Sequence, residues 1–309
     1  MADQGRRRVV AVAVYAVLLC AWSALIGIPN DTVGVVLWLW LFTIAWSSDR
    51  PRREHLRFAR DWWLPVLLLV CYWFLRGLAD EVGLPVHVTE PIRFDEWLSQ
   101  LFGGDGTVPT VALQHEWCGS PCVKESAPHW YDVLLTTVYA SHFWVSLTLA
   151  LVLWMRSRAE WVLWIRRYVT LALTGLVGYV VYPTAPPWMA SRDGFLPQVS
   201  RITGRGWSEL HVERTNIVLH GMANKVAAMP SLHAGFAFLV AYYGIWRLRS
   251  PLRWLLLLYP AAMSLALVYF AEHYVLDVLV GGLLAGLVMV GCSWWEHRQL
   301  SGTSPAPRP

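Results

Sequence analysis

Charged residues are scarce in this chain of 309 residues: Asp, Glu, Lys and Arg together make up 15%, against about 25% in an average soluble domain. Hydrophobic residues make up 56%. This balance excludes a disordered, coiled-coil or collagen-like chain. Cysteine is also sparse, with five residues, which excludes a small scaffold held together by disulfides.

The chain contains instead several apolar runs longer than the roughly 18 residues that indicate a membrane-spanning helix. Its 20 tryptophans fit the same class, because Trp gathers at membrane interfaces. We therefore predict an all-α, polytopic membrane helix bundle with about eight transmembrane helices. The predicted spans are residues 9–28, 33–46, 62–79, 130–155, 161–182, 232–246, 254–270 and 274–295.

The distribution of positive charge predicts how these helices are oriented. Seventeen of the 25 Lys and Arg residues fall in five groups on one side of the predicted bundle. The positive-inside rule places this side, with both chain termini, in the cytoplasm. The two long connections, residues 80–129 and 183–231, then face outward. We expect a multi-pass plasma-membrane protein, and the charge asymmetry explains the net charge of +4 without a nucleic-acid partner.

The first outer connection contains two features of interest. Apolar residues recur at helical spacing from Phe94 to Phe102, which predicts an amphipathic helix in the membrane interface or a lid packed over the bundle. Cys118 and Cys122 follow, and an oxidising exterior favours a disulfide between them. The alternative is a zinc site formed with His115 and His129, but the ligand spacing fits no common zinc template, so we expect no metal.

Three titratable residues near the outer ends of predicted spans are candidates for catalysis. His233 begins the sixth span, and His273 begins the eighth, with Asp277 four residues later. An i,i+4 pair shares one helix face, so Asp277 can orient the ring of His273 and leave its other nitrogen free to attack a substrate. His233 could then protonate a leaving oxygen. A polar pair that only joins two helices is the alternative.

Other polar and small residues allow a structural as well as a functional interpretation. His142, in the fourth span, either binds substrate or forms a hydrogen bond between helices. Gly282 and Gly286 form a GxxxG pattern, which indicates close packing inside the bundle or a homodimer face. Five cations in the second outer connection could bind an anionic headgroup or could simply be solvated: Arg192, Arg201, Arg205, Arg214 and Lys225.

Residues 230–235 (PSLHAG) and 272–281 (EHYVLDVLVG) resemble the second and third signatures of the type 2 phosphatidic acid phosphatase superfamily. Residues 182–188 (YPTAPPW) and 94–114 are similar to its inositol-phosphotransferase branch, which includes inositol phosphorylceramide synthases. The resemblance implies a core of six helices and a phosphohistidine on His273, supported by Asp277, with His233 as acid and then base. It also implies that no metal or other cofactor is required.

One departure from the superfamily affects how phosphate is bound. The phosphatase branch has an Arg six residues before the nucleophilic His, and here that position is Leu267. We expect other groups, such as Lys225 and Arg192, to hold the phosphate. The further substrate-binding candidates are Tyr182, Pro183, Thr184, Ser231 and His142.

The predicted spans and the resemblance together divide the chain into N-terminal transmembrane helices (1–80), an outer loop with the amphipathic helix (81–129), a catalytic transmembrane core (130–297) and a disordered tail (298–309). We expect transfer of a phosphoryl headgroup from a lipid-linked donor, such as a phospholipid or polyprenyl phosphate, to an acceptor hydroxyl. With water as acceptor, the same site would be a lipid phosphatase or polyprenyl pyrophosphate phosphatase. A lipid transporter or a lipid-binding subunit are the non-enzymatic alternatives.

Overall fold

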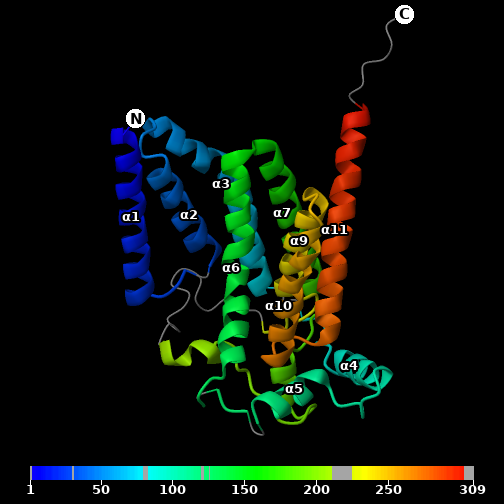
Figure 1. Cartoon of the computed structure of the whole chain (residues 1–309). Coiled ribbons are helices and arrows are strands. Elements are labelled where there is room, and N and C mark those ends of the chain that lie inside the picture. Colours follow the sequence, from blue (N-terminus) through cyan, green and yellow to red (C-terminus); the bar gives the residue numbers. More distant parts are fainter. Residues whose placement is uncertain are drawn as a thin grey trace, which may run out of the picture.

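The computed structural model describes residues 2–29, 31–78, 83–119, 122–124, 126–210 and 225–302. In these residues the chain forms α-helices and short 3-10 helices and no β-strand, which confirms the predicted all-α bundle (Figure 1). The long elements are α1 (Ala2–Leu25), α2 (Thr32–Trp46), α3 (Arg52–Leu78), α6 (Trp130–Arg156), α7 (Arg158–Val181), α9 (Leu232–Arg247), the 3-10 helix η3 (Pro251–Leu257) with α10 (Leu258–Tyr269), and α11 (Val275–Gly302).

A helix occupies each of the eight predicted spans, and the bundle is polytopic as predicted. Among the described residues, five segments are long and apolar enough to cross a membrane: Gly5–Leu25, Arg53–Gly77, Trp130–Arg156, Pro251–Tyr269 and Val275–Gln299. The apolar helix α2 has 15 residues. α9 has 16 residues, and α7 contains Arg166 and Arg167 within its length.

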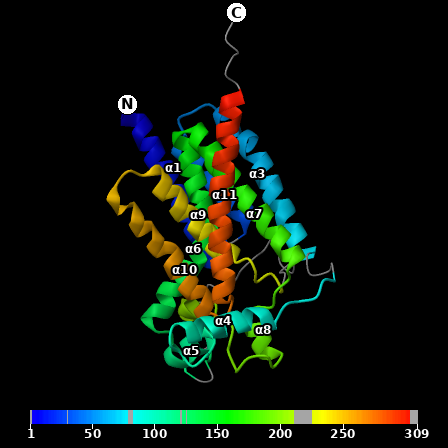
Figure 2. The same cartoon turned by 90° about the vertical axis from the view of Figure 1, so that its right-hand side faces the viewer.

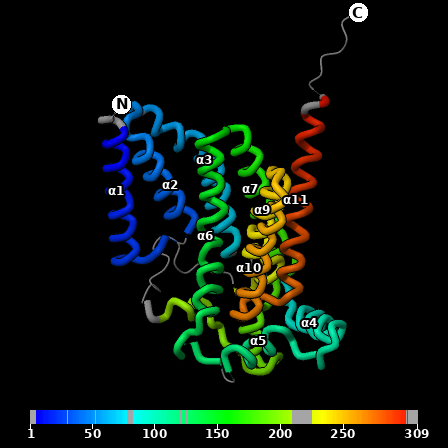
Figure 3. The backbone as a smooth tube through the Cα atoms, viewed as in Figure 1, coloured from blue at the N-terminus to red at the C-terminus, as the bar shows by residue number. Residues whose placement is uncertain are grey.

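The centre of the bundle is built on α7 and α9. Trp164 and Leu171 of α7 and Leu239 of α9 are completely shielded from solvent. α3, α6 and α11 pack around these two helices, while α1 packs against α2 at one edge. Figure 3 shows α1 and α11 at opposite edges of the bundle. The apolar core therefore lies where α7 and α9 meet their neighbours.

The short helices gather at one end of the bundle (Figure 2). They are α4 (Thr89–Leu101), α5 (Pro109–Trp117), α8 (Pro187–Arg192) and the 3-10 helix η2 (Arg205–Leu210). The start of α1 and the end of α11 lie at the opposite end. The two long connections thus cover one end of the helices. That this covered end faces outward remains a prediction from the charge distribution.

Capping side chains and prolines fix where the helices begin and end. Asp31 accepts a hydrogen bond from the backbone N–H of Gly34 at 2.8 Å and begins α2. Ser157 caps α7, and Ser231 caps α9 by accepting from the N–H of Ala234. α7 ends just before Pro183, because the residue before a proline is disfavoured in helical geometry.

α11 extends through residues 298–302, the first part of the segment for which the sequence predicts a disordered tail. The Ser301 hydroxyl donates to the carbonyl oxygens of His297 and Arg298, so the last turn is hydrogen-bonded. Residues 303–309 of that predicted tail lie outside the described residues. Earlier in α11, both carboxylate oxygens of Glu296 accept hydrogen bonds at 2.8 Å from buried Arg167 of α7. This ion pair joins α7 to α11 at the end remote from the short helices.

A very close approach between helices occurs where α9 crosses α11. A Cβ atom placed on Gly281 would lie 2.3 Å from the carbonyl oxygen of Ser231. On the same helix, Gly282 faces the ring of Phe238, and Gly286 faces Tyr242. The GxxxG residues therefore pack against α9 within this chain, which is the first of the two interpretations drawn from the sequence.

Replacing Gly281 with Ala should force α9 and α11 apart. We expect the free energy of unfolding to fall by about 1–3 kcal/mol, the usual cost of overpacking a tight contact. Gly291→Ala is the matched control, because a Cβ there meets no atom within 4 Å. Alanine is the better helix former, so this control should be neutral or slightly stabilising. Thermal unfolding of both purified variants provides the comparison, and equal melting temperatures would contradict the close packing of α9 on α11.

Candidate active site

Two helix beginnings bring the signature residues together. His233 lies in the first turn of α9, and His273 lies just before α11. The centroids of their rings are 5.8 Å apart. The backbone N–H of Ser231 donates to the carbonyl oxygen of Asp277 at 3.0 Å, which fixes one helix beginning to the other. The two histidines, 40 residues apart in sequence, therefore face a common space.

Asp277 lies behind His273 as predicted, although His273 precedes α11 and Asp277 belongs to its first turn. Asp277 Oδ2 is 3.5 Å from His273 Nδ1, and the Asp277 side chain is fully buried. The same oxygen accepts a hydrogen bond from the N–H of Tyr274 at 2.9 Å, which holds the carboxylate in place. A separation of 3.5 Å is longer than a normal hydrogen bond, and such contacts commonly tighten when substrate binds. The arrangement directs Nδ1 toward the carboxylate and leaves Nε2 for chemistry.

α6 contributes a third histidine to the same space. The ring of His142 is 4.3 Å from that of His233, centroid to centroid, and the ring of Tyr139, also from α6, stacks on His233 at 5.1 Å. His142 Nδ1 is buried and has no hydrogen-bond partner. His142 also lines the cavity described below, so its ring borders the space that a ligand would occupy. The three histidines form a row across the end of the bundle.

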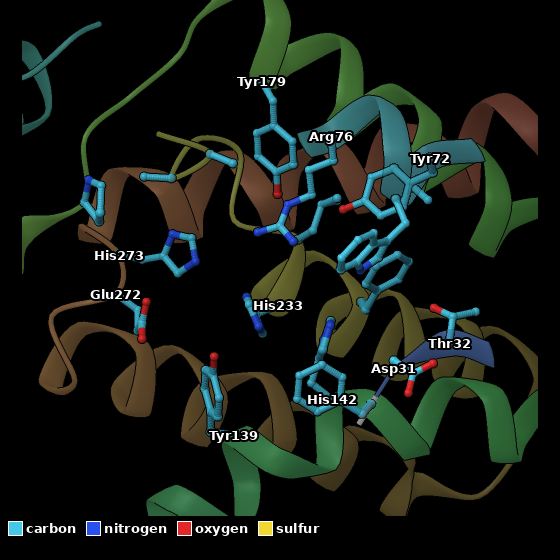
Figure 4. Close-up of a pocket in the computed structure, with 18 of the residues that line it drawn as sticks. Asp31, Thr32, Tyr72, Arg76, Tyr139, His142, Tyr179, His233, Glu272 and His273 are labelled. Atoms are coloured by element: carbon cyan, nitrogen blue, oxygen red, sulfur yellow. The ribbon is translucent and has the colours of Figure 1, made fainter. Parts of the chain in front are cut away.

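A cavity of about 420 Å³ lies beside this row. Figure 4 shows His233, His273 and Glu272 at one part of it, and Asp31, Thr32 and Tyr72 at another, with His142 between. Its walls come from α2, α3, α6, α7 and α9 and from the connections that precede α8, α9 and α11. The polar groups around the histidines and the apolar walls from Leu69 and Leu147 together suit an amphiphilic ligand.

The sequence-predicted residues Tyr182, Pro183, Thr184 and Ser231 lie next to this cavity without lining it. The ring of Tyr182 stacks on His87 at 3.7 Å, and the carbonyl oxygen of Pro183 accepts from the N–H of His87. Thr184 is fully buried and pairs through its backbone with Val226 and Ala228. These residues join the two long connections to each other and so shape the wall that contains Ala227 and Ala228.

The predicted cations occupy different environments. Lys225 lines the cavity, whereas Arg192 lies outside its lining and binds Asp193 with two hydrogen bonds. Arg201 lines the cavity and binds both carboxylate oxygens of Glu272, the residue before His273. Arg214 lies outside the described residues. Of the two cations proposed from the sequence to hold phosphate, only Lys225 borders the cavity.

Arg205 is buried in a cluster of side chains that joins two parts of the chain. It is 1% exposed and forms an ion pair with the fully buried Asp132 at 3.2 Å. Asp132 also accepts a hydrogen bond from the hydroxyl of Tyr269 at 2.8 Å. Arg205 contacts the sulfur of Cys118, which forms a disulfide with Cys122 in the structure. This cluster joins the first outer connection to the end of α10, four residues before His273.

A comparison with known protein families identifies the family to which this chain belongs. The model of the PAP2 superfamily matches residues 113–291, more than half of the chain. The chain belongs to the PAP2 superfamily. The matched region begins in α5 and includes His233, His273 and Asp277, the residues that meet at the beginnings of α9 and α11.

Two curated relatives are similar to this PAP2 protein, and each match covers less than two thirds of the relative's length. One is the phosphoinositol dihydroceramide synthase of Bacteroides thetaiotaomicron, 28% identical over 174 residues, which cover 52% of this chain and 56% of the relative. The other is the inositol phosphorylceramide synthase catalytic subunit aur1 of Schizosaccharomyces pombe, 27% identical over 131 residues, which cover 40% of this chain and 31% of the relative. No solved structure matches the chain.

Asp95 is a site residue that the sequence analysis missed. It belongs to α4, before the PAP2 region, and its side chain is fully buried. Its two carboxylate oxygens accept hydrogen bonds from the N–H groups of Val275 and Leu276, at 3.0 and 3.2 Å, so it caps the first turn of α11. Burial raises the pKa of Asp95 to about 7, against the effect of these hydrogen bonds. The pattern of residues 94–102 does not reveal this role of Asp95, because the N–H groups that it binds lie 180 residues later in the sequence.

Arg76 is the second missed residue. It lies in the last turn of α3, also before the PAP2 region, and its side chain borders the cavity (Figure 4). Its guanidinium carbon is 6.0 Å from the centroid of the Tyr179 ring. A charged residue inside a predicted span is itself a signal of function, and sequence reasoning could have used that signal for Arg76. Among the described residues, no cluster of three or more His, Cys, Asp or Glu side chains has the geometry of a metal site.

Removing the carboxylate of Asp95 should loosen the beginning of α11. For Asp95→Ala we expect a loss of about 1–2 kcal/mol in the free energy of unfolding, as for other helix caps, together with reduced turnover because His273 immediately precedes this turn. The folded-state pKa of Asp95 is raised, so its contribution to stability is largest below about pH 4, where free Asp is protonated, and falls as the pH rises to 7. The difference in melting temperature between wild type and Asp95→Ala should therefore narrow between pH 4 and pH 8. Glu96→Gln on the same helix is the control, and a difference independent of pH would contradict this account.

Proposed function

We propose that this PAP2 protein is an integral-membrane lipid phosphotransferase that moves a phosphoryl headgroup to an acceptor hydroxyl through a phosphohistidine on His273. The observation that carries the proposal is the convergence of His273, His233 and Asp277 beside a cavity with both polar and apolar walls. The names of the two relatives support inositol phosphate as the transferred headgroup, with a phosphoinositide as donor.

In the first step, His273 Nε2 attacks the phosphorus of the donor lipid. The bond from phosphorus to nitrogen forms as the bond from phosphorus to the lipid oxygen breaks. His233, 5.8 Å away between ring centroids, is placed to give its proton to the departing oxygen. Asp277 stabilises the positive charge that develops on the ring of His273. The products of this step are a lipid alcohol and the phosphohistidine.

In the second step, the neutral His233 removes the proton of an acceptor hydroxyl. The acceptor oxygen then attacks phosphorus, and the bond from phosphorus to nitrogen breaks. His142, with its buried Nδ1 beside His233, is a substrate-binding residue for this acceptor. Lys225, at the cavity lining, is a further substrate-binding residue. Each step inverts the configuration at phosphorus, so the complete reaction retains it.

A lipid phosphatase is the second candidate, and it requires only that water replace the acceptor. The depth of the cavity favours transfer: it continues past His142 to Asp31 and Thr32, which leaves space for an acceptor larger than water. We further propose that the covered end of the bundle faces the outside of the plasma membrane, with both termini in the cytoplasm. The substrates would then be lipids of the outer leaflet.

His273→Ala in the purified full-length protein tests this proposal. With phosphatidylinositol labelled in its phosphate group, we expect turnover to fall by about 1,000-fold or more, because the nucleophile is lost, and the acid-labile label on the protein to disappear. His297→Gln, in the exposed last turns of the same helix, should retain both. If His273→Ala keeps its turnover and its label, another residue is the nucleophile.

A further inference from the structure

The proposed reaction needs a cation at the phosphoryl group, and the usual position cannot supply one. Leu267 stands where the phosphatase branch has an arginine. Its side chain is completely buried and packs with Met263 and Ala237 in an apolar cluster. The residue at this position therefore contributes to packing between α9 and α10. The charge that stabilises the phosphoryl group has to come from elsewhere in the cavity.

Three cations line the cavity among the described residues, and they differ in their surroundings. Arg201 is bound by both oxygens of Glu272, so its charge is already balanced by a carboxylate. Lys225 is exposed and follows directly on a stretch outside the described residues. Arg76 is partly buried and comes from a membrane-spanning helix. Of these three, only Arg76 combines burial with a place on a rigid helix.

The position of Arg76 is suited to the reacting group. Figure 4 shows its guanidinium between Tyr179 and Tyr72, pointing into the space that His233 and His273 border. The ring of Tyr179 limits its movement on one side, at 6.0 Å from the guanidinium carbon. Charges in membrane spans are costly and persist where function requires them. Tyr72 and Tyr179 bring two hydroxyl groups to the same part of the cavity, which adds to its polarity.

We propose that Arg76 is the residue that binds the phosphoryl oxygens of the substrate during transfer. A guanidinium presents two parallel N–H groups that match two oxygens of a phosphate. It remains protonated at any physiological pH and would balance the charge that spreads over the equatorial oxygens as the bonds to phosphorus change. This inference rests on the proposed function and adds the cation that function requires.

The assignment gives the N-terminal helices a part in the chemistry. The PAP2 region, residues 113–291, contains the nucleophile and the acid but leaves out α3. α3 packs directly against α7, the helix that carries Tyr179, and this contact places Arg76 at the cavity. A core made only of the PAP2 region would therefore lack its phosphate-binding cation.

Binding of inorganic phosphate to the full-length protein tests the proposal without requiring turnover. The melting temperature is measured against phosphate concentration at constant ionic strength, with chloride as the balancing anion, and yields an apparent Kd. Arg76→Met should weaken phosphate binding about 10- to 100-fold, the range expected for loss of a charged hydrogen-bonding partner. Arg76→Lys, which keeps the charge and loses the paired N–H groups, should fall between this variant and wild type.

Arg60→Gln is the matched control. It removes an arginine from the same helix, at the far end from the cavity, where the side chain is 74% exposed. Its phosphate affinity should stay within about twofold of wild type, because phosphate contacts are short-ranged at this ionic strength. Wild-type affinity in Arg76→Met, or no phosphate binding by wild type, would overturn the assignment. If Arg76→Met does not fold, unchanged affinity in Arg76→Lys overturns it.

The phosphate affinity of His273→Ala separates this inference from the proposed function. Loss of the labelled intermediate without loss of phosphate affinity is expected if the cation, and not the nucleophile, binds phosphate. If wild type never becomes labelled but Arg76→Met still loses phosphate affinity, the proposed phosphohistidine fails and the assignment of Arg76 stands. If wild type becomes labelled but Arg76→Met keeps wild-type phosphate affinity, the assignment of Arg76 fails and the proposed phosphohistidine stands.

Discussion

The contact between the beginnings of α9 and α11 is the constraint on which the site depends. The N–H of Ser231 donates to the carbonyl oxygen of Asp277, and Gly281 has no side chain to hold the two helices apart. This approach places His233 beside His273 and leaves Asp277 buried behind it. A backbone hydrogen bond and a glycine therefore determine the geometry that the imidazole chemistry requires. The close packing of α9 on α11 thus occurs next to His233 and His273, the proposed reacting side chains.

Much of the fold could be predicted because a membrane imposes few alternatives. Apolar runs of sufficient length form helices in a bilayer, where every backbone polar group has to be satisfied within the helix. The proximity of Asp277 to His273 was predicted from their i,i+4 spacing, but His273 precedes the first residue of α11, so the contact is made across the beginning of the helix and not along one helix face. The convergence with His233 was predicted from its place at the outer end of another span, and the resemblance to a family gave it the role of acid and base. The boundaries were less predictable, and α11 runs to Gly302, past the point where a tail was expected.

Contacts between distant parts of the chain could not be predicted from local patterns. Asp95 looked like one more polar residue on an amphipathic helix, yet it caps α11 across 180 residues of sequence. Arg205 looked like a solvated cation and is buried against Asp132 and a disulfide. Arg76 stands inside a predicted span, where a charge is a signal of function, but the sequence does not show that it borders the same cavity as His233 and His273. In each case the residue acts together with groups from another part of the chain. A single sequence without an alignment does not show which distant residues are in contact.

Stereochemistry at phosphorus tests the central claim most directly. A phosphoinositide donor made chiral at phosphorus by one sulfur substitution would be converted to product, and the configuration of the product determined. Transfer through a phosphohistidine on His273 involves two inversions and predicts overall retention. Inversion would mean that the acceptor attacks the donor lipid directly, and it would contradict a covalent intermediate at this site.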